Sequence, residues 1–266
     1  MMDTYRAYFG LTQTPFSQDI KELLPTVNVT SVLERMRYVM ELGAVGIITG
    51  DIGSGKSSAV RFAISKLHPA EHSILYITAT TGSVIELYRQ IAHSLKLETR
   101  SPSRSYLQRA IKQAVTEVTN KKRKLLLIVD EASLLRLDVF GELHTLLQYH
   151  IDSKGLLPLL LVGQSNLVDM LSFPKAKALA SRVVARGHMQ PLNDGEVRQY
   201  LEHHLKLAGC KRNLFTDEAM TAIRQGASGA LRKINNLARG GLIAAAKQEQ
   251  QEVSAEHIRV AATELI

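Results

Sequence analysis

The segment at residues 50–57 places the strongest constraint on how this chain folds and what it binds. It reads Gly-Asp-Ile-Gly-Ser-Gly-Lys-Ser, so a glycine at each end of a six-residue loop is followed at once by lysine and a hydroxyl residue. An apolar run at residues 45–49 comes before it. A helix is predicted from Ser57 to Leu67, because Val60, Ile64 and Leu67 recur at helical spacing. A strand, this loop and then a helix form the context in which such a loop binds phosphate.

Each position of the loop has a physical task. Gly53 and Gly55 can adopt backbone angles that turn successive N–H groups toward one anionic phosphate. Lys56 would reach the β- and γ-phosphates, and the Ser57 hydroxyl would hold Mg²⁺. The positive end of the following helix adds to the same attraction. We therefore predict a nucleoside triphosphate site made of these residues: Gly50, Asp51, Ile52, Gly53, Ser54, Gly55, Lys56, Ser57 and Ser58.

A second apolar run, residues 125–129, ends in the acid pair Asp130 and Glu131. A continuous apolar run is typical of a parallel strand covered on both faces, and ligands bind beyond the carboxyl ends of such strands. We expect Asp130 to assist Ser57 in holding Mg²⁺, and Glu131 to polarise the water that attacks the γ-phosphorus. A surface acid pair without function is the alternative.

Alternating strands and helices predict an α/β domain with a parallel sheet sandwiched by helices. Further strands are expected at residues 74–78 and 159–162, the latter between the phosphate loop and the acid pair. Gln164, just after this strand, would contact the γ-phosphate or cap the next helix. Ser83 and Glu86 are predicted to form a capping box at a helix start.

The pattern of residues divides the chain into three parts. Residues 1–44 form an N-terminal approach segment packed on the core, in which Tyr8–Leu11 and Pro15–Phe16 are expected to be extended. Residues 45–190 form the nucleotide-binding α/β domain. Residues 191–266 are wholly helical in pattern and form a small second domain.

The balance of charge favours a polyanionic partner. The 266 residues include 33 Lys and Arg against 25 Asp and Glu, a net charge of +8, which favours nucleic acid first and an acidic membrane surface second. Residues 121–124 are all basic and form either a solvated turn or a nucleic-acid contact. One cysteine excludes an intrachain disulfide, and no apolar run reaches the ~20 residues of a membrane span, so we expect a cytoplasmic protein.

Three arginines are candidates for the chemistry of the γ-phosphate. Arg182 or Arg186 would reach a neighbouring subunit's nucleotide as the γ-phosphate leaves, unless they serve in salt bridges or nucleic-acid contacts. Arg232 begins a helix of the second domain and would fold back onto the phosphates as part of a lid. His203 and His204 have no Cys or clustered acid partners in the sequence, so we expect surface or core histidines rather than metal ligands.

These motifs resemble those of the AAA+ ATPases. The resemblance implies an AAA+ fold with a helical lid, and ATP hydrolysis with Mg²⁺. The loop at residues 50–57 and the acid pair match the family's two nucleotide motifs. The remaining matches are Gln164 at the first sensor, Ser181-Arg182 at the arginine-finger box, and Gly229 to Arg232 at the second sensor.

Within that family the chain is similar to the ExeA-like group, through Tyr8–Leu11, Pro15–Phe16 and Leu161–Gln164. One branch is a secretion-pathway ATPase that continues into a membrane span and a cell-wall-binding region. Stand-alone members are ATPase partners of DNA transposases. This chain ends without those regions. Residues 142–145 and 179–186 are also similar to the stand-alone branch, so we expect the chain to belong with it. Ser165 stands where the family usually has proline.

The resemblance implies an ATP-hydrolysing homo-oligomer, a ring or a filament on double-stranded DNA, that helps a transposase to select or activate its target, without a membrane partner. By topology the DNA contacts would be Thr81, Ser83, Arg100 and Arg104. An ATPase that assists assembly of a secretion or cell-envelope complex without binding DNA is the alternative. A third possibility is a switch in which ATP-dependent assembly matters more than turnover.

Overall fold

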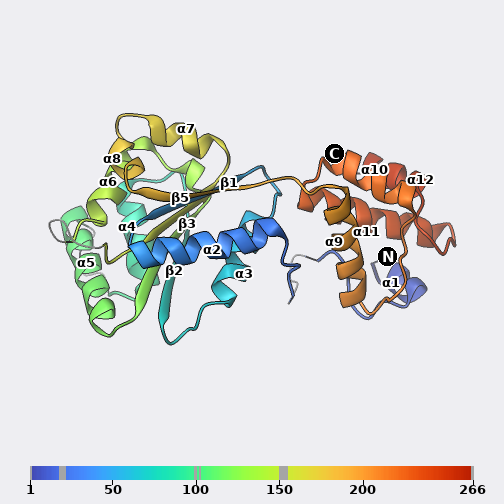
Figure 1. The fold of residues 1–266 in the computed structure, drawn as a ribbon, viewed down its shortest axis with the longest axis horizontal. Helices are drawn as coiled ribbons and strands as arrows, with labels where there is room; N and C mark the ends of the chain where they lie inside the picture. Colours follow the sequence, from blue (N-terminus) through green and yellow to red (C-terminus); the bar gives the residue numbers. More distant parts are fainter. Residues whose placement is uncertain (1, 18–21, 99–100, 102, 150–154, 265–266) are drawn as a thin grey trace. The chain divides into compact units, whose positions relative to one another are not determined.

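The computed structural model describes residues 2–17, 22–98, 101, 103–149 and 155–264, and it contains two compact units. The sheet unit comprises Val27–Asp51 and Lys56–Met189 (Figure 1). The helical unit comprises Met1–Thr26, Ile52–Gly55 and Gln190–Ile266.

The centre of the sheet unit is a parallel sheet in the order β2-β3-β4-β1-β5. Its strands are β1 (Val45–Gly50), β2 (His72–Thr78), β3 (Lys124–Asp130), β4 (Leu159–Gly163) and β5 (Val183–Met189). β4 pairs with both β1 and β3, which confirms the predicted position of this strand between the phosphate loop and the acid pair. The parallel α/β fold predicted from the sequence is thereby confirmed.

Helices cover both faces of this sheet (Figure 1). One face carries α2 (Val27–Leu42) and α3 (Lys56–Ser65), and the other carries α4 (Val84–Ser94), α5 (Arg104–Asn120) and α6 (Leu137–Leu146). The short elements η1 (Ala132–Leu134), α7 (Asn166–Ser172) and α8 (Lys177–Ala180) complete the unit. β1 and β4 are buried along their whole length, because apolar residues on both faces of these strands meet helices.

The helical unit is built from α1 (Met2–Phe9), α9 (Asp194–Leu207), α10 (Asp217–Ala227), α11 (Leu231–Lys247) and α12 (Ala255–Thr263). These helices share one apolar core. A capping box between Asn193 and Glu196 begins α9, and the Thr216 hydroxyl accepts from the Ala219 amide to begin α10. Across the described ranges, no helix combines the length and the apolar character that crossing a bilayer requires.

The N-terminal residues differ from the sequence-based expectation in two ways. Tyr8 and Phe9 end helix α1 rather than lying in an extended stretch, and Gly10 follows with a φ of +67°. Tyr5 and Phe9 lie one helical turn apart and are both buried, so packing in the helical unit stabilises a helix too short to persist alone. The first 44 residues are also shared between the units, since α1 packs in the helical unit and α2 on the sheet.

The predicted capping box at the start of α4 is wrong. Ser83 does occupy the N-cap position, but its side chain makes no capping hydrogen bond. The Glu86 carboxylate instead accepts a hydrogen bond from the Thr80 hydroxyl at 2.9 Å. This competing local bond removes the partner that the reciprocal cap needs.

Candidate active site

The phosphate loop has the backbone geometry that its glycines permit. Gly53 and Gly55 have φ angles of +80° and +92°, a left-handed region that residues with a Cβ rarely adopt. Ser54 between them is buried, and its hydroxyl oxygen has no hydrogen-bond partner among the described residues. An unsatisfied buried hydroxyl needs an explanation, and a bound anion is one. Ile52, by contrast, is 65% exposed.

Lys56 is the first residue of α3, and its side chain is buried. Its Nζ donates hydrogen bonds to the carbonyl oxygens of Gly50 at 2.8 Å and Asp51 at 2.9 Å. Buried ammonium groups are costly unless they are hydrogen-bonded, and these carbonyls of the preceding loop meet that need. These two bonds hold the ammonium beside the loop.

Hydrogen bonds in the sheet unit fix the carboxylate of Asp130, which is the last residue of β3 and is 4% exposed. The Ser57 hydroxyl donates to Asp130 Oδ2 at 2.8 Å, and the Tyr76 hydroxyl donates to the same oxygen. The Glu131 amide donates to Oδ1 at 2.9 Å. The structure thus brings together Ser57 and Asp130, which lie far apart in the sequence and were predicted to share a metal ion.

Tyr76 is a member of this network that the sequence analysis missed. Burial and the hydrogen bond to Asp130 raise the pKa of the Tyr76 hydroxyl, which therefore remains a proton donor at neutral pH. In the sequence it reads as one more apolar residue of a strand. The signal lies in the register, because β2 pairs with β3 so that Thr78 is opposite Asp130, two residues beyond Tyr76.

Glu131 occupies an unusual backbone conformation. Its φ of +53° is left-handed, which is uncommon for a residue with a side chain and is concentrated at functional sites. The segment immediately after it, η1, is tied to the end of β4, because the Gln164 amide donates to the Ser133 hydroxyl at 3.3 Å. Gln164 is therefore placed at the carboxyl edge of the same sheet, and it is half-buried.

The residues present fit a magnesium nucleotide. Mg²⁺ prefers oxygen ligands, and the Ser57 hydroxyl and the Asp130 carboxylate supply such oxygens side by side. A triphosphate suits a glycine loop, a helix N-terminus and an ammonium, and the chain supplies all three between Gly50 and Ser58. The unpartnered hydroxyl of Ser54 fits the same ligand.

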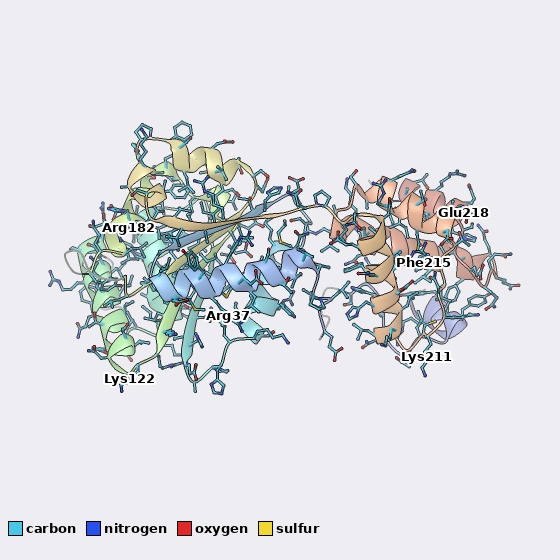
Figure 2. The ribbon with its side chains drawn as sticks, in the orientation of Figure 1. Arg37, Lys122, Arg182, Lys211, Phe215 and Glu218 are labelled. Atoms are coloured by element: carbon cyan, nitrogen blue, oxygen red, sulfur yellow. The ribbon has the colours of Figure 1, made fainter. Side chains whose placement is uncertain are left out.

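The two candidate trans-acting arginines have different surroundings. Arg182 lies between α8 and β5 in the sheet unit and is half-buried (Figure 2). Burial first, and the charge of Arg182 second, lower the pKa of His144 on α6. Arg186 is exposed on β5, where its carbonyl oxygen accepts from Arg35 Nε at 2.6 Å.

β5 itself was not predicted from the sequence. The buried residues of β5 do not form a continuous run, because Arg186 and His188 are exposed while Gly187 and Met189 are buried. β5 ends the strand order, so only β1 pairs with it, and a helix covers one of its faces. An edge strand of this kind tolerates the polar residues that hide it from a search for apolar runs.

Arg232 belongs to the first turn of α11, and its side chain is exposed. Its amide donates to the carbonyl oxygen of Gly53 at 3.1 Å, a bond within the helical unit. The glycine has no room for a side chain there, because a Cβ at Gly53 would come within 2.9 Å of the Arg232 Cβ.

The predicted DNA contacts fall into three groups. Thr81 and Ser83 are exposed in the segment between β2 and α4. Arg104, the first residue of α5, forms an ion pair with Glu142 on α6, which also accepts from the Tyr88 hydroxyl at 2.9 Å. The Arg104 side chain is nonetheless more than half exposed, at 57%. Arg100 lies outside the described residues.

Comparison with known proteins points to the same chemistry. Residues 40–171 match the protein family described as the AAA domain. The chain is 29% identical over 265 residues to general secretion pathway protein A of Aeromonas hydrophila, a match that covers 98% of this chain and 48% of that protein. The chain therefore spans about half the length of this relative.

Solved structures share the fold at low identity. Cdc6p from Pyrobaculum aerophilum superposes with a TM-score of 0.73 at 16% identity, covering 94% of this chain and 70% of that one. The Aeropyrum pernix ORC1 protein, solved in complex with DNA, gives 0.68 at 15% identity, covering 94% and 68%. With the loop and the network around Asp130, these matches show that the chain has the fold of a P-loop AAA+ protein, and they support ATP hydrolysis as its chemistry.

Proposed function

We propose that this ATPase assembles as a homo-oligomer on double-stranded DNA and assists a transposase in selecting or activating an insertion target. The observation that carries the DNA part is charge. Residues 219–248 contain no acid, and most of this stretch forms α11, on which Lys233 and Lys247 are exposed. Exposed cations of this kind bind phosphates by releasing counterions. A DNA complex of the ORC1 protein, which shares the fold, supports the proposal.

ATP binding and hydrolysis supply the energy for this assembly and for its assistance to the transposase. The loop and Lys56 would hold the triphosphate, while Ser57 and Asp130 would hold Mg²⁺, which supplies charge neutralisation at the phosphates. Glu131 would orient and polarise the attacking water. Gln164 and Arg232 would contact the γ-phosphate and report its presence to the rest of the protein.

The trans-acting arginine distinguishes an oligomeric ATPase from a monomeric one. We assign this role to Arg182, because its half-buried position can hold a fixed orientation, whereas Arg186 is exposed on an edge strand. Removing such an arginine costs roughly 10³-fold or more in rate. Arg182→Ala should therefore be inactive, and Arg186→Ala serves as the matched control.

Mixing two inactive variants tests this assignment. Arg182→Ala retains its own Glu131, and Glu131→Gln retains its own Arg182, so mixed oligomers contain some complete sites. We expect the mixture to recover ATPase activity that neither variant has alone. No recovery, or loss of activity in Arg186→Ala with retention in Arg182→Ala, would contradict the assignment.

A gel-shift assay with a duplex of random sequence tests DNA binding. We expect a shift at about 50 mM salt that requires a non-hydrolysable ATP analogue and weakens steeply as salt rises. Arg104→Gln should reduce the salt slope by about one. The control Arg109→Gln removes one exposed charge from the same helix and should leave the slope unchanged. No shift in either nucleotide state would remove the DNA proposal.

A second function is favoured by the curated relative. The match to general secretion pathway protein A extends over 98% of this chain, so an ATPase that helps to assemble a secretion or cell-envelope complex is the competing candidate. Affinity purification from nuclease-treated cells separates the two. Recovery of a membrane complex, with no DNA binding by the purified protein, would favour the secretion function.

A further inference from the structure

Tyr76 reaches the metal-binding edge of the sheet from a strand that carries no nucleotide motif. Its hydroxyl and that of Ser57 both donate to Asp130 Oδ2, and the Glu131 amide donates to Oδ1. A carboxylate offers about four lone-pair positions. The two hydroxyls use both lone pairs of Oδ2, and the Glu131 amide uses one lone pair of Oδ1. One lone pair of Oδ1 therefore remains free.

Packing alone does not account for this tyrosine. The residue is 41% exposed, in a strand whose Leu75 and Ile77 are buried on the opposite face. A phenylalanine or an aliphatic residue would serve as well at such an exposed position, but neither could donate a hydrogen bond. The feature particular to tyrosine here is the hydroxyl, and that hydroxyl donates a hydrogen bond to Asp130.

We propose that Tyr76 is a positioning residue for magnesium binding. Its hydrogen bond fixes the rotation of the Asp130 carboxylate, so that the free lone pair of Oδ1 would be available to assist the metal that Ser57 would hold. This inference rests on the proposed metal roles of Ser57 and Asp130. Without the Tyr76 hydroxyl, the carboxylate must be ordered at the moment the metal binds, and metal binding is weaker.

Tyr76→Phe removes the hydroxyl and keeps the ring. The test measures ATP affinity by calorimetry in EDTA and across a magnesium titration. We expect ATP affinity in EDTA to be unchanged, and the Mg²⁺ concentration that half-saturates the enhancement of binding to rise about tenfold, as expected for loss of one hydrogen bond to a charged group. The ATPase rate at saturating Mg²⁺ should recover toward that of the wild type.

Tyr88→Phe is the matched control, because the Tyr88 hydroxyl donates to the Glu142 carboxylate at 2.9 Å in the same unit but away from the acid pair. It should leave the magnesium requirement unchanged. Equal behaviour of the two variants would overturn the inference, as would a lower magnesium requirement in Tyr76→Phe, which would mean that the hydroxyl competes with the metal. Ser57→Ala should abolish the magnesium enhancement. If it does not, the proposed metal site fails, and the role of Tyr76 fails with it.

Discussion

Apart from Ser54 of the phosphate loop, the two units of this protein bury polar side chains for different purposes. In the sheet unit, Lys56 is buried at the start of α3, and Asp130 is buried at the carboxyl end of β3, where it is bonded to side chains from other elements. In the helical unit, His204 and His257 are buried and satisfy main-chain amides. The first arrangement places charge where a ligand can reach it, and the second removes the cost of leaving an amide unpaired.

His204 shows the structural use clearly. Its Nδ1 accepts from the Phe16 amide at 3.2 Å, and its ring stacks on Phe16 with centroids 5.1 Å apart. Burial, assisted by the charge of His203, lowers the pKa of His204 to about 3. The neutral ring therefore fixes the N-terminal segment to α9. A buried titratable group is thus not by itself a sign of a site, and its partners decide the interpretation.

The largest expected effect is on chemistry, at Asp130. Asp130→Asn removes the negative charge that assists Mg²⁺, and we expect a loss of about 10²–10³-fold in ATPase rate, the equivalent of a few kcal/mol. Thermal unfolding should change only modestly, because the amide oxygen can still accept hydrogen bonds from Ser57 and Tyr76, and only the bond from the Glu131 amide is lost. A large fall in melting temperature, with the ATPase rate of the remaining folded protein unchanged, would show that Asp130 has a structural role, like His204 and His257.

The next effect is on stability, at His204. An unfolded histidine binds a proton below pH 6.5, whereas the folded one does so only near pH 3. The unfolded state therefore binds more protons, and the free energy of unfolding should fall by about 1.4 kcal/mol for each pH unit below 6.5. Urea unfolding followed by circular dichroism at pH 7, 6 and 5 measures this slope.

Matched variants isolate this contribution. His204→Asn retains a hydrogen-bond acceptor but cannot titrate, so the contribution of about 1.4 kcal/mol per pH unit to the free energy of unfolding should disappear. His93→Asn, at an exposed position on α4, should keep it. A slope that is the same in wild type and His204→Asn would contradict the role assigned to His204.

The smallest effect concerns Thr49, which could break the contrast between the units. Thr49 is buried at the end of β1 beside the phosphate loop, yet its hydroxyl is bonded to the Gly187 carbonyl oxygen at 3.3 Å and to His188 Nδ1 at 3.0 Å, both on β5. These partners indicate a structural role. Thr49→Val should cost about 1 kcal/mol of unfolding free energy and leave ATP affinity unchanged. Weaker ATP binding at unchanged stability would show that Thr49 belongs to the site.

The parts of the fold that follow local rules could be predicted from the sequence. The phosphate loop is specified by residue types at fixed spacing, and strands β1, β3 and β4 are continuous apolar runs because both faces are covered. The position of β4 beside the loop followed from the same reasoning.

Features that depend on distant partners could not be predicted. Strand β5 forms because β1 offers it a free edge, and its own residues carry no apolar run. Helix α1 depends on burying Tyr5 and Phe9 against helices that come two hundred residues later. The bond from Tyr76 to Asp130 follows from the register between β2 and β3, which no single stretch of sequence contains.

Retention of ATP by the Lys56→Ala variant is the most direct test of the central claim that the loop and this ammonium bind the triphosphate. Equilibrium dialysis with labelled ATP and Mg²⁺ would compare it with the wild type and with Lys66→Ala, a control lysine just after α3 whose ammonium lies 5.1 Å from the centroid of the Phe62 ring. The account predicts that the wild type and Lys66→Ala retain ATP and that Lys56→Ala does not. Equal retention by all three proteins would contradict it.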